Sequence, residues 1–268
     1  MRIWEQGLVA TYSMPGYKEL ILEHYDAYKR PGTEIAVHGV RDVANPTAAK
    51  IAGKAVQYVY LQRFHDNQIL ENVRRAEREG FDAVIIGALQ DPGLIAARTV
   101  VDIPVIGYGE VSMLTACMHG TRFTFVSINP DMDPVIRTMI RDHGMEHRVA
   151  PTAFMECGYA DLGDAVAGKP ARFLAAFEAA ARKSMREHGV DVILPGQTII
   201  AELLWKAGIR EIDGALVLDP RLPLLRMAEM LVDMRKAGLG VSRRGFYWAK
   251  PPKDLEQGVR DFYAAPDR

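Results

Sequence analysis

Cysteine is scarce in this sequence, which has only two, Cys117 and Cys157, among 268 residues. Two cysteines cannot build a disulfide framework, so we expect a protein of a reducing compartment. No hydrophobic run is long enough to cross a membrane, and the first residues lack the pattern of a signal peptide. These absences predict a cytoplasmic location.

An excess of charge of one sign is also lacking, because the formal net charge is -1 at pH 7. A nucleic acid or an anionic membrane would need a basic face, so neither is an expected partner. The sequence has no phosphate-binding loop, dinucleotide fingerprint or Gly-x-Ser-x-Gly elbow. His143 and His147 are four residues apart, but Gly144 breaks the helix between them. We therefore expect no cofactor, no metal and a small molecule as partner.

What the sequence has instead is a regular alternation of short apolar runs with amphipathic stretches. The apolar runs are continuous, which is typical of strands buried on both faces of a parallel sheet. We expect strands at 7–11, 34–38, 82–87, 104–107, 122–127, 149–157, 191–194 and 211–213. Helices are expected at 66–79, 92–100, 131–142, 170–188 and 221–237, and an irregular tail from 238. This order predicts an α/β fold with helices on both faces of its sheets.

The chain also contains an internal repeat. Residues 79–88 and 188–197 share a helix end, a glycine, an aspartate, an apolar strand and a second glycine. Residues 105–107 match 212–214, and 9–13 more weakly match 126–130. The pairs predict two pseudo-symmetric, doubly wound lobes, at 1–104 plus 212–237 and at 105–211, with 238–268 as a tail. The alternative is that any two strand–helix units look alike.

Two lobes of this kind predict an active-site cleft outside the carboxyl ends of their strands. Small residues and neutral hydrogen-bonding groups follow those ends, and they suit a small carboxylate or a cyclic amide. The candidate substrate-binding residues are Ser13, Ala88, Leu89, Gln90, Ser127, Asn129 and Thr198. Gln197 and Tyr12 are candidates for a catalytic role. Asp91, before Pro92, is better explained as a helix cap than as an acid.

Acid–base work could be done by Glu110 or His38. Glu110 follows an expected strand and enters a helix, where it could act as a general base or serve the helix dipole. His38 ends a strand and would reach the mouth of the cleft. Cys117 is expected on a buried helix face, where a free cysteine behaves as a small apolar residue. Cys157 has no basic neighbour that would activate its thiol, so catalysis by either cysteine is not expected.

Residues 81–94 and 103–110, together with 122–127 and 211–214, resemble the hydantoin racemases of the aspartate/glutamate racemase superfamily. The resemblance covers residues 1–237 and implies two similar lobes with the active site between them. It also implies a pair of cysteines, one per lobe, that remove and return a proton. The matching positions here are Ala88 and Gln197, and neither can be a thiolate. Arylmalonate decarboxylase resembles an intermediate case that keeps the second cysteine.

The resemblance and the missing thiols together leave three hypotheses. The first is a cysteine-independent enzyme that decarboxylates, hydrolyses or isomerises a small carboxylate or cyclic amide. It would use acid–base groups and a stabilised oxyanion. The second is a non-catalytic protein that binds small molecules, and the third is a racemase with bases other than thiols. The sequence is compatible with a homo-oligomer but does not fix one.

Overall fold

In the computed structural model the chain is described at residues 1–8, 16–40, 58–245 and 247–264. Its first sheet is wholly parallel and has the strand order β2-β1-β3-β4. The strands are β1 (Arg2–Gln6), β2 (Glu34–His38), β3 (Ala83–Ile86) and β4 (Val105–Gly107). β1 lies between β2 and β3, so its carboxyl end is at the centre of one sheet edge.

The second sheet repeats this strand order as β6-β5-β7-β9 and adds β8 at its edge. Its strands are β5 (Phe123–Ser127), β6 (Ala153–Phe154), β7 (Val192–Pro195), β8 (Glu211–Ile212) and β9 (Ala215–Val217). All neighbours are parallel except β8 and β9, which form a tight antiparallel hairpin. The prediction of an α/β fold with mainly parallel sheets is confirmed.

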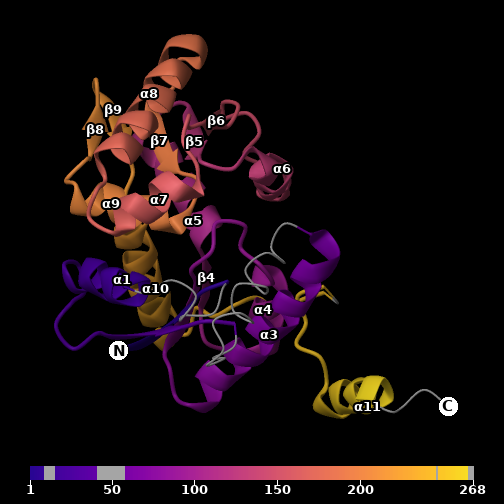
Figure 1. The fold of residues 1–268 in the computed structure, drawn as a ribbon. Helices are drawn as coiled ribbons and strands as arrows, with labels where there is room; N and C mark the ends of the chain where they lie inside the picture. Colours follow the sequence, from indigo (N-terminus) through magenta and orange to yellow (C-terminus); the bar gives the residue numbers. More distant parts are fainter. Residues whose placement is uncertain (9–15, 41–57, 246, 265–268) are drawn as a thin grey trace.

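Helices cover both sheets. α1 (Tyr17–Asp26), α3 (Val59–Arg78), α4 (Leu94–Val100) and α10 (Arg221–Lys236) pack in the first half. α6 (Asp133–Asp142), α7 (Tyr159–Val166), α8 (Ala171–His188) and α9 (Thr198–Lys206) follow strands of the second half. Figure 1 shows α5 (Tyr108–His119) and α10 running between the two sheets. One apolar core joins both sheets along these helices, and it includes Ile85 of β3, Leu224 of α10 and Phe125 of β5.

The predicted boundaries between the halves differ from the observed strand pairing. β4 joins the first sheet, although residue 105 was predicted to begin the second lobe. β8 and β9 join the second sheet, although 212–237 was assigned to the first lobe. The reason is that β9 pairs with β7 in the second sheet as β4 pairs with β3 in the first, whereas the prediction gave that place to residues 212–214. The chain returns to the first sheet only with α10, which packs on β3 and β4.

Two other predictions were wrong in detail. The first strand is Arg2–Gln6 and not 7–11; Gly7 and Leu8 follow it, and 9–11 lie outside the described residues. The tail is not wholly irregular, because Lys253–Ala264 forms α11. α11 stands at the edge of the molecule, with ion pairs from Glu256 to Arg74 and from Arg260 to Glu71 on α3 (Figure 1). Within the described chain, no helix combines the length and apolar character needed to cross a membrane.

Candidate functional site

A cavity of about 190 Å³ lies where the carboxyl ends of strands from both sheets meet. The first sheet contributes residues at the ends of β1, β2 and β3, and the second sheet contributes the turn after β7. The start of α1 closes one side. The described lining residues are Glu5, Gly7, Leu8, Tyr17, Lys18, Ile21, Val37, His38, Gly87, Ala88, Leu89, Gln90, Met132, Tyr159, Gly196, Gln197 and Thr198. The two turns of the internal repeat therefore face one cavity.

Six residues predicted for the site line this cavity: His38, Ala88, Leu89, Gln90, Gln197 and Thr198. Ser127 and Asn129 are not among the lining residues but support them. Ser127 Oγ accepts a hydrogen bond from Gln197 Nε2 at 2.7 Å, and Asn129 Nδ2 donates to the Tyr159 hydroxyl at 3.2 Å. Tyr12 and Ser13 lie outside the described residues.

The amide of Gln197 is held in one orientation. Its Oε1 accepts the Ile128 backbone N–H at 3.3 Å, so its nitrogen must face Ser127. One N–H of that nitrogen goes to Ser127, which leaves the second N–H for a ligand oxygen in the cavity. Gly196 permits this turn, because a Cβ there would meet Val126 O at 2.8 Å and Ser127 Cβ at 2.9 Å.

Glu110 does not line the cavity, contrary to the prediction that it belongs to the site. Its carboxylate forms a bidentate ion pair with Arg98, at 2.9 and 2.5 Å. Asp91 is indeed a cap, but of α5 rather than of the helix that follows it, because its carboxylate accepts the Gly109 and Glu110 N–H groups. Glu110 is therefore held in a structural ion pair at the start of α5.

Glu5 is a lining residue that the sequence analysis missed. It is 1% exposed, and both of its oxygens have partners: Arg221 Nη1 donates to Oε1, and the Tyr25 hydroxyl donates to Oε2 at 2.6 Å. Gly87 makes room for this carboxylate, since a Cβ at that position would collide with Glu5 Oε1. A glycine at the end of β3 is thus required by the buried charge beside it. The available signal was a glutamate directly after the apolar pair Ile3 and Trp4.

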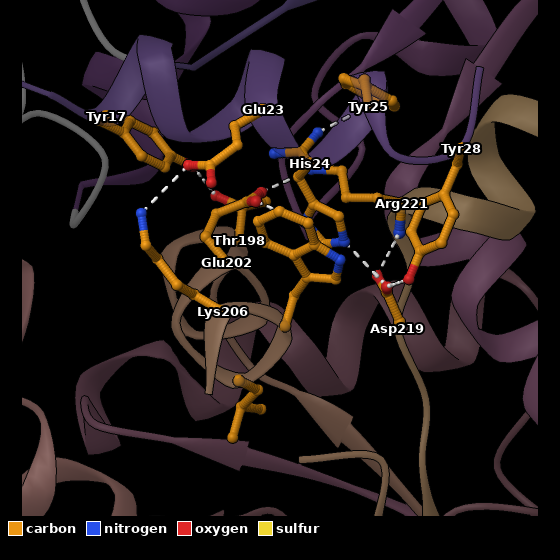
Figure 2. Close-up of polar contacts among 12 residues, drawn as sticks. Tyr17, Glu23, His24, Tyr25, Tyr28, Thr198, Glu202, Lys206, Asp219 and Arg221 are labelled. Carbon is orange, nitrogen blue, oxygen red and sulfur yellow. Dashed lines mark hydrogen bonds and ion pairs between the residues drawn. The ribbon is translucent and has the colours of Figure 1, made fainter. Parts of the chain in front are cut away.

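Behind the cavity, a buried polar network joins the two halves of the molecule (Figure 2). Arg221 at the start of α10 is fully buried and donates from Nε to Glu202 Oε1 of α9 at 2.7 Å, besides its bond to Glu5. His24 of α1 lies between two carboxylates, with Nδ1 2.5 Å from Glu202 Oε2 and Nε2 2.8 Å from Asp219 Oδ2. The network fixes α1 against α9.

The same two helices meet again at the cavity wall. The Tyr17 hydroxyl of α1 lies 2.6 Å from Thr198 Oγ1 of α9, and both residues line the cavity. Burial is the main cause that raises the pKa of the Tyr17 phenol, so it stays protonated near neutral pH. Tyr17 can therefore position a ligand or donate a hydrogen bond, but it is a poor base.

His24 gives the network a dependence on pH. Burial alone would lower the pKa of its imidazole, but hydrogen bonds to Asp219 and Glu202 and their negative charges outweigh burial, and the pKa is raised. Because the folded state binds this proton more tightly, its stabilisation is fully present below about pH 6.5, the ordinary histidine pKa. This stabilisation is lost as the pH rises through the raised pKa of His24.

We expect a His24→Gln variant to lose more stability at pH 6 than at pH 9, measured by urea unfolding. The difference between the two losses reports the pKa shift, at about 1.4 kcal/mol per unit. His188→Gln, at the end of α8, is the matched control and should change little at either pH. Equal losses for His24→Gln at both pH values would show that the fold does not raise the pKa of this imidazole.

The two cysteines lie away from the cavity lining. Cys117 is partly buried in α5, and Cys157 is partly buried after β6. Burial is the main cause that raises the pKa of the Cys157 thiol, which opposes formation of a thiolate. Ala88 and Gln197, which both line the cavity, carry no thiol. The described lining of the cavity therefore contains no cysteine.

Comparisons with known proteins give one consistent family. A family model described as Asp/Glu/Hydantoin racemase matches residues 17–228. The chain is 28% identical over 188 residues to the hydantoin racemase of Pseudomonas sp. (strain NS671), which covers 70% of this chain and 73% of the relative. Over 179 residues it is 27% identical to the hydantoin racemase of Rhizobium meliloti, and this match covers 67% of this chain and 70% of the relative.

Solved structures with the same fold include an allantoin racemase from Klebsiella pneumoniae. Its TM-score is 0.73 at 24% sequence identity, and the match covers 94% of each chain. An allantoin racemase from Pseudomonas fluorescens also gives a TM-score of 0.73, at 22% identity over 94% of this chain and 98% of the other. At these identities the likeness concerns the fold.

Proposed function

This chain belongs to the Asp/Glu/hydantoin racemase family, and from that premise we propose that it is an enzyme that works without thiols on a small carboxylate or a cyclic amide. The observation that carries the proposal is the cavity between the Ala88 and Gln197 turns. It retains one wall from each sheet, yet neither turn supplies a base. The curated relatives are hydantoin racemases, which supports a cyclic amide or a related small acid as substrate.

His38 is the proposed proton-transferring group. It ends β2, lines the cavity and is held flat against Trp4, with ring centroids 3.4 Å apart and an interplanar angle of 10°. An imidazole is the side chain whose ordinary pKa best suits proton transfer near neutral pH. The second N–H of Gln197 and the Thr198 hydroxyl would stabilise negative charge that develops on a substrate oxygen. Decarboxylation, hydrolysis and isomerisation each fit these roles.

Racemisation with non-thiol bases is less well supported. It needs a base on each face of the substrate carbon, and the described lining offers a single imidazole, while the one carboxylate, Glu5, is already bound by Arg221 and Tyr25. A non-catalytic binding protein is the other alternative, and loss of both thiols favours it. Both alternatives make predictions that differ from those of a one-base enzyme.

The test is a panel of 5-substituted hydantoins, their ring-opened carbamoyl acids and small malonates, incubated with the protein in deuterated water and followed by NMR. Net conversion to a new product supports the proposal. Deuterium uptake at the stereocentre without net conversion would identify a racemase. Compounds that raise the melting temperature but are never converted would identify a binding protein.

For any compound that is converted, we expect Gln197→Ala to reduce kcat by about 10²–10³-fold, the usual effect of removing one oxyanion donor. The fold should persist, because the Ser127 hydroxyl keeps its hydrogen bonds with the Asn129 backbone. Gln257→Ala on the exposed helix α11 is the matched control. Unchanged turnover in Gln197→Ala would remove this residue from the site.

A further inference from the structure

The charge of the ligand is left open by the proposed function, because a small carboxylate is an anion and a cyclic amide is neutral. Lys18, in the first turn of α1, is the lysine in the described lining of the cavity. It forms no ion pair or hydrogen bond within the described parts of the chain. Lys18 is partly buried, and an anionic ligand would give its ammonium group a counter-ion.

The negative charge nearest to the cavity does not neutralise Lys18. Glu5 is held by the Arg221 guanidinium and the Tyr25 hydroxyl. Behind it, the network is balanced in charge. The carboxylates are those of Glu5, Glu202 and Asp219. Three cations accompany them. Arg221 bonds Glu202, and the imidazolium of His24 lies between Glu202 and Asp219. Arg210 lies beside the phenol of Tyr28, which donates a hydrogen bond to Asp219.

Two helix starts add positive potential to that of Lys18. α1 and α9 have 10 and 9 residues, and neither has a side-chain hydrogen bond at its cap. The first residues of both helices, Tyr17 and Thr198, line the cavity. Backbone N–H groups at helix starts favour anions. The apolar lining from Leu8, Ile21, Val37, Leu89 and Met132 lowers the local dielectric constant and so strengthens the electrostatic preference.

We infer that the cavity selects a small carboxylate over a neutral cyclic amide, and that Lys18 recognises its charge. This inference rests on the proposed function, which makes the cavity the ligand site. The carboxylate lies between Lys18 and the starts of α1 and α9, and the apolar side chains receive the body of the ligand. Lys18 is thereby the residue that sets substrate class, while His38 transfers the proton.

The experiment compares two matched probe pairs by isothermal titration calorimetry: phenylacetate with phenylacetamide, and N-carbamoylglycine with hydantoin. The phenylacetate pair has nearly the same shape and differs in charge, and the second pair compares a ring-opened acid with its neutral ring. We expect wild type to bind each acid at least about tenfold more tightly than its neutral partner, the effect of one hydrogen bond to a charged group. Lys18→Met should remove most of that preference, change neutral-probe binding less than about twofold, and weaken the salt dependence of acid binding.

Lys206→Met is the matched control, because Lys206 sits at the end of α9 and pairs with Glu23 on the surface. It should keep the preference of wild type. Neutral probes that bind as tightly as the acids, or an unchanged preference in Lys18→Met, would overturn the inference and leave the proposed function standing.

The Ala88→Trp variant, which fills the cavity, distinguishes failure of the inference from failure of the proposed function. Failure of all four probes to bind wild type, or binding that survives Ala88→Trp, would overturn the cavity as ligand site and the inference with it.

Discussion

Replacing Arg221 with methionine is expected to lower the free energy of unfolding by about 3–5 kcal/mol, the usual cost of removing one partner from a buried ion pair. Arg221 is fully buried, and its guanidinium bonds Glu5 and Glu202, which are also almost wholly buried. Methionine has a similar length, so lost volume is a small part of the effect. The main cost is that two carboxylates remain in the interior without their cation.

Ligand binding should fail together with stability. Glu5 lies against Gly87, and an unanchored carboxylate would press on the turn that carries Ala88. Urea unfolding measures the loss of stability, and calorimetry with the acid probes measures the loss of binding.

Arg235→Met is the control on the same helix, because Arg235 is exposed at its last turn. The double variant Arg221→Met, Glu5→Gln should recover part of the lost stability, since one buried charge is then absent. A loss below about 1 kcal/mol in Arg221→Met would show that the network contributes little.

The fold was largely predictable because the buried strands are continuous apolar runs. Observed strands such as Ala83–Ile86 and Val192–Pro195 fall inside the predicted ranges. β1 escaped prediction because it contains Glu5 and Gln6, which look like surface residues. In the fold Gln6 Oε1 accepts hydrogen bonds from Trp4 Nε1 and Asn72 Nδ2, so the polar group is buried with partners. Helix α5 lacks a polar face and therefore lacks the helical period that a sequence reveals. In α9, Thr198, Glu202 and Lys206 are spaced four residues apart, but Glu202 is buried with the apolar residues around it.

The site residues that lie in turns after strands could be predicted from the sequence. Those whose position depends on a hydrogen-bond partner far away in the chain could not. Glycine at the ends of β3 and β7 indicated the two turns at Ala88 and Gln197, and both line the cavity. No local pattern joins Arg221 to Glu5, which is 216 residues away, or His24 to Glu202, at 178 residues. Lys18 was missed for the same reason, since its place depends on where α1 packs. Long-range pairing of buried charges can be read only from the fold.

A second large effect is expected at His38, where substitution should reduce kcat by about 10²–10⁴-fold if the imidazole transfers the proton. Two variants separate this role from packing. His38→Asn removes both the titrating group and the ring that stacks on Trp4. His38→Phe retains a flat ring at that position and removes only the proton-transferring nitrogens. Both should lose turnover, whereas only His38→Asn should lose appreciable stability in urea unfolding.

The pH profile supplies the decisive readout, because loss of packing would not alter its shape. In wild type, kcat for a converted compound should change with the ionisation of one imidazole, and that limb should disappear from the residual activity of His38→Phe. Binding of the acid probes should persist in His38→Phe, since Lys18 and the starts of α1 and α9 are untouched. His188→Phe, on the surface at the end of α8, should leave rate and profile unchanged. Full turnover in His38→Phe would move the chemistry to another group and leave His38 as part of the wall beneath the ligand.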